Sequence, residues 1–386
     1  MQSWFDQLSG DGPKYLAIAE AIDHAVRTGA LRPGERLPPQ RDLARALAVD
    51  LTTVTRAYGL ARDAGLIEGA GRLGSYVRNS AGLPLADLTG DSGMIMPPQP
   101  GFALLADAMR QGLTALLRAG GQSPLLQYQP SGGALRDRQE AAAAFSARGI
   151  ATSEDEVIVA AGGQNALHAI LGTALSPGDI VAAPAATYPG MLALARRLGL
   201  RLRIVASDRG GIDPDAIDGA ARAGAKALYL VPTNDNPTTA TLDLERRAWI
   251  AERARHHGLQ LIEDDAYGRL PAEPLPPLAA LAPELTWHIA SVAKIVSPVL
   301  RVAHVRAPSI TAAARLAADI HATAVMAPPL NAAIVADWVA SGLFHQLADA
   351  VRAEARARRS IADAILDPGS FRARPEGYHL WMPLPA

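Results

Sequence analysis

The sequence predicts an α/β protein in two parts, a small helical unit followed by a larger domain built on a mostly parallel sheet. Three observations support this prediction. Residues 14–77 show apolar residues at helical spacing and then an alternating, glycine-containing stretch. From residue 101 onward, alanine-rich amphipathic stretches alternate with short apolar runs. The chain has 386 residues, of which 49% are hydrophobic and 19% charged, enough for more than one core.

The composition excludes several classes of protein. The chain has no cysteine, which excludes disulfides, cysteine-zinc sites and thiol catalysis, and we expect no metal site. The net charge of −1 excludes a generally basic nucleic-acid coat protein, so any DNA contact must come from a local surface. No apolar run approaches the ~18 residues of a membrane span, and the N-terminus lacks the layout of a signal peptide. We therefore expect a cytoplasmic protein without membrane contact.

Residues 1–78 are predicted to form a winged helix-turn-helix, because three short helices precede a ribbon-like stretch. The helices are expected at about 14–28, 40–47 and 51–64, and the ribbon at 65–77. The alternative is a helical interaction module whose threonine and arginine side chains form an ordinary solvated face. The candidate DNA contacts on the third helix and at the ribbon tip are Thr52, Thr53, Thr55, Arg56 and Arg72.

The remaining chain is predicted to be a linker and a large domain. Residues 79–100 are interrupted by proline and glycine throughout, as in a linker, and residues 101–386 form the domain. Six short apolar runs in this domain are predicted to be strands, namely Val157–Ala160, Ile180–Ala183, Arg203–Val205, Ala227–Val231, Leu259–Ile262 and Trp287–Ala290.

Polar motifs follow five of these strands, at the sheet edge where doubly wound proteins bind ligands. Gly162 and Gly163 form a turn that opens a helix, and the backbone N–H groups of such a turn suit a phosphate. Each motif taken alone also has an ordinary structural interpretation as a turn, a cap or a satisfied strand end. The other polar residues at this edge are Tyr188, Asn236, Asp264, Tyr267 and Lys294.

Lys294 is the residue that gives this set a chemical meaning. Only three of the 37 basic residues are lysines, and arginine cannot replace lysine where an amine must attack a carbonyl. Val, Ala, Ile and Val flank Lys294, so we expect it to be partly desolvated, which lowers the pKa of an amine. A phosphate turn, an aromatic ring, an amide, a carboxylate, a tyrosine and such a lysine together match the requirements of pyridoxal phosphate.

In these residues and in their order, the large domain resembles the fold-type I aminotransferases. Over residues 13 to about 384, the chain resembles the MocR subfamily of GntR-type bacterial regulators, which fuse a winged helix-turn-helix to an aminotransferase-like domain. Segment 37–44, Leu-Pro-Pro-Gln-Arg-Asp-Leu-Ala, is similar to the start of the GntR helix-turn-helix. This similarity implies that Arg41 contacts a DNA phosphate.

The resemblance also implies roles for the residues at the sheet edge. Lys294 would form the Schiff base with pyridoxal phosphate, and Asp264 would pair with the pyridine nitrogen. Asn236 and Tyr267 would bind the phenolic oxygen, and Tyr188 would stack on the ring. The phosphate would be bound by Gly163, Gln164, Ser291 and Arg301, with Tyr128 reaching the phosphate of the partner subunit in a homodimer.

The sequence departs from the family pattern at several places. Ala293, Thr239 and Ala303 replace a serine, a glycine and a second glycine that many relatives carry. The chain ends just after segment 377–382, which is a strand of the small domain at about 311–386. Relatives continue to an arginine that binds a substrate carboxylate. We therefore expect an incomplete small domain in this chain, and the missing arginine argues against transamination.

Three functions are compatible with this sequence. The first is a transcriptional regulator that binds double-stranded operator DNA as a homodimer. In that function the aminotransferase-like domain senses pyridoxal phosphate, an amine or an amino acid through a Schiff base at Lys294. The second is a pyridoxal-phosphate-dependent aminotransferase acting on an amino acid, and the third is a regulator that has lost the cofactor and only dimerises. The winged-helix pattern and the missing arginine favour the first.

Overall fold

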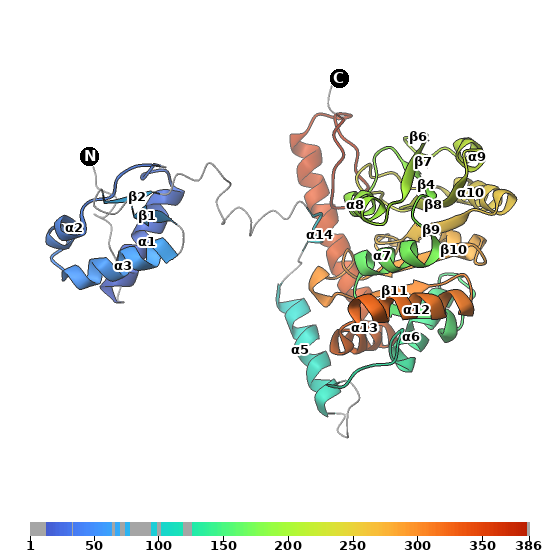
Figure 1. The fold of residues 1–386 in the computed structure, drawn as a ribbon, viewed down its shortest axis with the longest axis horizontal. Helices are drawn as coiled ribbons and strands as arrows, with labels where there is room; N and C mark the ends of the chain where they lie inside the picture. The colour runs from blue at the N-terminus through green and yellow to red at the C-terminus, as the bar shows by residue number, and fades with distance from the viewer. Residues whose placement is uncertain are drawn as a thin grey trace. The chain divides into compact units, whose positions relative to one another are not determined.

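The computed structural model describes residues 13–32, 34–63, 66–69, 74–77, 94–98, 102–118 and 126–383 (Figure 1). They belong to two compact units, Met1–Met94 and Ile95–Ala386. No helix within these ranges is both long and apolar enough to cross a membrane. Most of the linker predicted at 79–100 lies outside the described residues.

The N-terminal unit has the predicted winged helix-turn-helix architecture. Ile18 and Ile22 of its first helix pack with Val54 and Tyr58 of its third helix in one buried core. The Tyr58 hydroxyl donates a hydrogen bond of 2.8 Å to the carbonyl oxygen of Pro38, which ties the preceding turn to the third helix. The elements are α1 (Lys14–Arg27), α2 (Gln40–Ala46), α3 (Leu51–Asp63) and the antiparallel strands β1 (Ile67–Gly69) and β2 (Ser75–Val77).

The larger unit is built on a seven-stranded sheet with the strand order β3-β11-β10-β9-β8-β4-β5. From β10 through β9, β8 and β4 to β5 all pairs are parallel, which confirms the predicted mostly parallel sheet. All six strands predicted for the sheet are present, but segment 377–382, expected to be a strand of the small domain, forms only an isolated bridge between Trp381 and Arg372. The strands are β3 (Val157–Ala160), β4 (Ile180–Pro184), β5 (Arg201–Val205), β8 (Ala225–Leu230), β9 (Gln260–Asp264), β10 (Thr286–Ser291) and β11 (Ala303–Arg306).

Strand β11 is absent from the strands that the sequence predicts. It has only four residues, and two of them, His304 and Arg306, are polar although all four are buried. It is antiparallel to both of its neighbours, so it begins at the sheet edge where β10 ends. This orientation brings Arg301, just before β11, to the same edge. Two further short strands, β6 (Ser207–Asp208) and β7 (Gly211–Ile212), form a separate hairpin.

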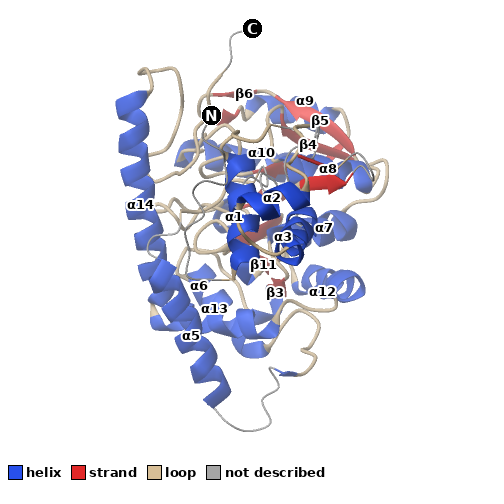
Figure 2. Cartoon of the chain, turned by 90° about the vertical axis from the view of Figure 1, so that its left-hand side faces the viewer, coloured by secondary structure: helices blue, strands red, loops and turns tan. Residues whose placement is uncertain are grey.

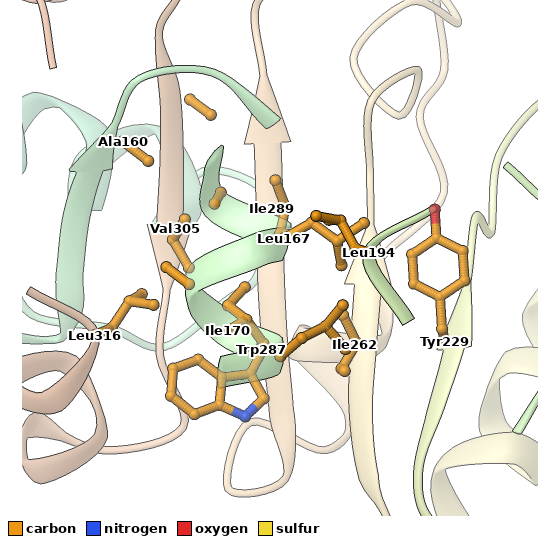
Figure 3. Close-up of a cluster of buried hydrophobic side chains, with 14 of the residues drawn as sticks. Ala160, Leu167, Ile170, Leu194, Tyr229, Ile262, Trp287, Ile289, Val305 and Leu316 are labelled. Carbon is orange, nitrogen blue, oxygen red and sulfur yellow. The ribbon is translucent and has the colours of Figure 1, made fainter. Parts of the chain in front are cut away.

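Helices cover both faces of this sheet, and strand side chains alternate between the two faces. On one face, Tyr229, Ile262 and Trp287 pack with residues of α7, α8 and α12 (Figure 3). On the other face, Leu228 and Leu261 pack in a core with α9, α10 and α11, while α6 contributes to a smaller cluster. These helices are α6 (Leu135–Ser146), α7 (Gly163–Ala174), α8 (Pro189–Arg197), α9 (Asp215–Arg222), α10 (Leu244–His257), α11 (Leu278–Leu281) and α12 (Ile310–Ala324).

Three more helices form a further buried core with the segment that follows β10. Trp338 and Phe344 pack there with Val296 and Leu300. The longest of these helices, α14, runs along one side of the unit in Figure 2. The bounds are α5 (Phe102–Arg118), α13 (Pro329–Ser341) and α14 (Leu343–Ile365), with single 3-10 turns η3 (Glu154–Glu156) and η4 (Pro298–Leu300).

Arg247 of α10 fixes the loop that follows β8. Its side chain is fully buried and donates hydrogen bonds of 2.9 to 3.1 Å to the carbonyl oxygens of Pro232, Leu242 and Pro276. A single buried cation thus binds both ends of the loop that carries Asn236. Buried carbonyl oxygens need donors, so the shape of this loop depends on Arg247.

We expect Arg247→Met to lower the free energy of unfolding by about 3 kcal/mol, because the buried carbonyl oxygens of Pro232 and Leu242 and the partly buried one of Pro276 each lose a hydrogen bond. Urea unfolding followed by circular dichroism measures this. Arg253→Met in the same helix is the control, since its side chain is 39% exposed and pairs with Asp215 and Asp218. The control should cost less than about 1 kcal/mol. Equal losses in the two variants would contradict this role of Arg247.

Candidate functional site

The residues predicted at the sheet edge are brought together by the strand directions. Strands β4, β8, β9 and β10 are parallel and end at one edge, and β3 ends there as well because two antiparallel pairings separate it from β10. Tyr188 follows β4, Asn236 follows β8, Asp264 ends β9, and Lys294 follows β10. The site is therefore assembled from loops far apart in the sequence.

Lys294 and Asp264 form the charged centre of this edge. Burial lowers the pKa of the Lys294 amine, and the nearby Asp264 carboxylate partly opposes that shift. Burial also raises the pKa of Asp264 to about 6, although the Tyr229 hydroxyl and Lys294 favour its ionised form. The Lys294 ammonium donates a hydrogen bond to the carbonyl oxygen of Ile95, in the segment that begins the larger unit.

A turn of two glycines lies beside these charges. Gly162 caps α7 with a φ of 92°, and an added Cβ there would lie 3.0 Å from the guanidinium carbon of Arg301. An added Cβ on Gly163 would lie 3.3 Å from the Cβ of Ser291. The backbone N–H groups at the start of α7, including that of Gln164, thus lie close to a cation and a hydroxyl. This arrangement suits an anion such as a phosphate.

Two tyrosines and an amide complete this edge. Tyr188 caps α8, and its pKa is raised by burial and by Asp264 but lowered by Arg301, so it lies near both. Tyr267 is only 2% exposed, and its hydroxyl has no hydrogen-bond partner among the described residues. Burial, Asp264, Tyr188 and Asp235 all raise the pKa of Tyr267. The loop of Asn236 therefore also approaches Tyr267.

Tyr128 is the one predicted cofactor residue that this chain does not bring to the cluster. Its side chain is 81% exposed. It lines a shallow hollow with Leu126, Met326 and Leu330 rather than with the charged centre. Its predicted contact with a partner subunit is a feature that a single chain does not test.

A buried ionic network, which the sequence pattern did not indicate, lies next to Asp264. Treated in isolation, Glu263-Asp264-Asp265 has the composition of a solvated acidic cluster, yet Glu263 is fully buried and Asp265 is 3% exposed. Glu263 accepts hydrogen bonds from two backbone N–H groups at the start of α11 and contacts His288 at 2.8 Å. Asp265 pairs with Arg148. The position of the triplet on a central strand was the signal that could have indicated burial.

The predicted DNA contacts lie on the surface of the N-terminal unit. Arg41, Thr52, Thr55 and Arg56 are exposed, and Thr53 is half-buried. Two of these side chains are already engaged, because Thr55 donates to Gln40 Oε1 at 2.9 Å and Arg56 stacks 3.9 Å above the ring of Tyr15. Arg72, predicted at the ribbon tip, lies outside the described residues.

Two further arginines join Arg41 in a groove of this unit. Arg36, Arg41 and Arg62 line a cavity of about 670 Å³ together with residues of α3 and the two strands. The guanidinium of Arg36 lies beside Gly74, where an added Cβ would be 3.1 Å from its Nε. Arg36 sits in a proline-rich turn and Arg62 near the end of α3, so neither position stood out in the sequence. Three arginines in one groove suit a phosphate backbone.

Comparison with known families agrees with this geometry. Residues 101–381 match the family "Aminotransferase class I and II", and residues 14–77 match "Bacterial regulatory proteins, gntR family". The chain belongs to the aminotransferase class I and II family. Together with its GntR-family unit, the chain has the domain composition of the MocR-type regulators, which confirms the resemblance identified in the sequence.

Relatives with both units cover nearly the whole chain. The uncharacterized HTH-type transcriptional regulator YdeF of Bacillus subtilis is 28% identical over 99% of this chain and 84% of its own. The vitamin B6 salvage pathway transcriptional repressor PtsJ of Salmonella typhimurium is 27% identical over 97% of this chain and 86% of its own. Among solved structures, the α-aminoadipate aminotransferase LysN of Thermus thermophilus, complexed with N-(5'-phosphopyridoxyl)-L-leucine, has a TM-score of 0.65 and 26% identity over 76% of each chain.

The residues of this chain fit the cofactor that the aminotransferase fold normally binds, pyridoxal phosphate. The hydroxyl of Tyr267 is buried without a partner, as expected of a group reserved for a ligand. Gly162 and Gly163 leave room beside Arg301 and Ser291 for an anion. An amine and a carboxylate stand within electrostatic reach of each other at the same edge.

We expect Arg148→Met to destabilise the fold by about 3 kcal/mol at neutral pH, because it leaves the buried Asp265 carboxylate with only the His288 ring, at 3.7 Å, as a partner. In the wild type, burial raises the pKa of Asp265, but Arg148 and His288 outweigh burial and hold it below its ordinary value. The ionised Asp265 carboxylate therefore stabilises the fold at pH values above the ordinary pKa of an aspartate. Without Arg148 the buried carboxyl group binds a proton more readily.

The loss in Arg148→Met should therefore shrink as the pH falls from about 7 to about 4 and Asp265 takes up a proton. Urea unfolding over this pH range measures the change. The control is Arg136→Met at the start of α6, the helix that ends just before Arg148, because Arg136 pairs with Asp337 at the surface with 57% of its side chain exposed. A pH-independent loss in Arg148→Met would contradict the assignment.

Proposed function

We propose that this protein is a pyridoxal-phosphate-binding transcriptional regulator that binds double-stranded DNA through its GntR-type unit. The observation that carries the proposal is that one chain combines an arginine-lined winged helix with an amine, a carboxylate and an anion turn at one sheet edge. Relatives with both units are named as transcriptional regulators, and one is a vitamin B6 salvage pathway repressor. The effector is pyridoxal phosphate itself, or an amine or amino acid that reacts with it.

In this proposal each residue of the sheet edge has a role toward the cofactor. Bound pyridoxal phosphate supplies an aldehyde for a Schiff base, and Lys294 is the amine that would carry it. Asp264 would pair with the ring nitrogen, and Tyr188 would stack on the ring. Asn236 and Tyr267 would donate to its phenolic oxygen. The phosphate would be held by backbone N–H groups of Gly163 and Gln164 and by the side chains of Ser291 and Arg301.

The regulator is proposed to act as a homodimer. Exposed apolar side chains, including Leu113 and Leu117 of α5 and Leu126 beside Tyr128, offer surface that a second copy would cover. A dimer would place Tyr128 against the partner subunit, which accounts for its exposure in one chain. It would also present two winged helices to two half-sites of an operator.

Lys294 links the sheet edge to the segment through which the two units are joined. Its ammonium donates to the carbonyl oxygen of Ile95, and residues 95–98 are the first described part of the larger unit. The free Lys294 side chain can use any of its N–H groups for this hydrogen bond, whereas in a Schiff base Nζ would be bound to the ligand carbon and would keep at most one N–H group. Occupation of Nζ by a ligand therefore frees the Ile95 carbonyl oxygen, and this competition couples the ligand to the joining segment.

Fluorescence anisotropy on an operator duplex at fixed salt tests the coupling. We expect pyridoxal phosphate to change the DNA affinity of the wild type about tenfold, a typical coupling between two sites. Lys294→Arg keeps a cation that can donate to Ile95 but cannot form a Schiff base, so its affinity should stay at the cofactor-free value. Lys294→Ala loses the donor, so its affinity without cofactor should resemble that of the loaded wild type.

Two outcomes would contradict this function. If pyridoxal phosphate leaves the specific DNA affinity of the wild type unchanged, as we expect for both variants, then the protein does not sense this cofactor. DNA binding that competitor DNA abolishes equally with and without cofactor would favour the aminotransferase, since the solved relative LysN is such an enzyme. Loss of an amino group from an added amino acid would then be the activity to measure.

The groove arginines provide a separate prediction for DNA binding. Arg36→Ala should weaken binding to all sequences and reduce the slope of log K against log salt concentration by about 1, as expected for one lost phosphate contact. Arg45→Ala is the matched control, because Arg45 is exposed, pairs with Asp42 and lies outside the groove. Equal salt slopes for Arg36→Ala and the wild type would rule out the groove as the phosphate-binding surface.

A further inference from the structure

We propose that Tyr229 is a positioning residue for Asp264, which holds one carboxylate oxygen and keeps the carboxyl group ionised toward the ring nitrogen of the cofactor. The inference rests on the proposed function, because it concerns the pyridoxal-phosphate site. The Tyr229 hydroxyl donates a hydrogen bond of 3.0 Å to Asp264 Oδ2. No other hydrogen bond to Asp264 side-chain oxygens occurs among the described residues, so Oδ1 stays available to a ligand.

The strand register explains why these two side chains meet. Tyr229 of β8 is paired with Ile262 of the parallel strand β9, and Asp264 lies two residues beyond Ile262. Residues two apart in a strand share a face, and a tyrosine is long enough to reach the diagonal neighbour. The Tyr229 hydroxyl therefore contacts Asp264 from the neighbouring strand of the sheet.

The packing of Tyr229 leaves its hydroxyl little freedom. The side chain is fully buried, and its ring belongs to the core that contains Ile262 and Trp287. Figure 3 shows the hydroxyl pointing toward the end of the sheet at which β10 terminates. Burial and the neighbouring Asp264 raise the pKa of Tyr229, so it remains a proton donor at neutral pH. Because packing already fixes the Tyr229 hydroxyl, this donor can orient the Asp264 carboxylate without losing further conformational freedom of its own.

The charges around Asp264 show why such a donor matters. Lys294 favours the ionised carboxylate, but in the proposed function its amine is used to bind the ligand. Asp265, the residue directly after β9, disfavours the ionisation of Asp264, and His288 on β10 favours it. The other titratable groups around Asp264 and Tyr229 are Tyr188, Tyr267 and Asp235, and burial raises the pKa of Asp235 to about 6 as well. Tyr229 is thus the neutral donor that continues to stabilise the carboxylate when the Lys294 charge is lost.

Binding of pyridoxamine 5'-phosphate by Tyr229→Phe tests the inference. This probe has the ring and the phosphate but no aldehyde, so its binding does not require a Schiff base at Lys294. In the wild type, affinity should fall as the pH drops through about 6, where Asp264 takes up a proton. In Tyr229→Phe the pKa of Asp264 rises, so the fall should begin at higher pH, and affinity at pH 7 should drop about tenfold. Isothermal titration calorimetry from pH 5 to 8 measures both.

Two further variants separate positioning from a merely structural role. In an Asp264→Asn background, Tyr229→Phe should have no effect on affinity, because the carboxylate it acts through is absent. Tyr58→Phe removes another buried phenol, in the N-terminal unit, and should leave the pH midpoint unchanged. An unchanged midpoint in Tyr229→Phe would overturn the inference, and so would an equal loss of affinity in the Asp264→Asn background. A wild type that binds neither form of the cofactor would instead overturn the proposed function.

Discussion

The structure of the larger unit depends on three consecutive carboxyl groups at the end of its central strand, β9, of which Glu263 and Asp265 are buried and Asp264 is half-buried. Burying a carboxylate is unfavourable unless partners compensate for the lost water. Because the strand alternates, Glu263 and Asp265 face α6 and α11, whereas Asp264 faces Tyr229 and the opposite layer. Each of the three carboxyl groups is compensated by different partners. Backbone N–H groups and a histidine compensate Glu263, an arginine compensates Asp265, and a phenol and an amine compensate Asp264.

These different partners separate the structural role of Asp265 from the proposed ligand-binding role of Asp264. Arg148 holds the pKa of Asp265 low, so Asp265 remains an anion that fixes the turn after α6 to the sheet. Asp264 has no arginine, and its pKa of about 6 leaves its charge sensitive to whatever occupies the edge of the sheet. A cationic ring nitrogen is the kind of partner that would complete it. Asp265 and its partner Arg148 thus lie inside the fold, whereas Asp264, which has no arginine partner, lies at the site.

The sequence predicted the fold well because helices and strands have local patterns. Six strands, the winged unit and the order of the site motifs could all be read from apolar spacing and turn residues. Strand β11 could not, since a four-residue run containing His304 and Arg306 has no strand pattern and is buried only through its neighbours. Tyr229 and Arg36 were missed for a related reason. Their roles arise from strand register and from the groove between elements, and neither is visible in a single segment.

The scarcity of lysine gives the proposed sensing a chemical basis. An aldehyde reacts with neutral amines, and a chain rich in surface lysines would offer many competing sites. Here Lys14 and Lys226 are exposed, and Lys294 alone among the three is partly buried, with a pKa lowered by that burial. Lys294 also lies beside an anion turn that would concentrate a phosphate next to it. In the proposed function, selectivity for a phosphorylated aldehyde would follow from two separate properties, the lowered pKa of one amine and the anchoring of the phosphate, and a ligand that lacks either group would meet only half of the site.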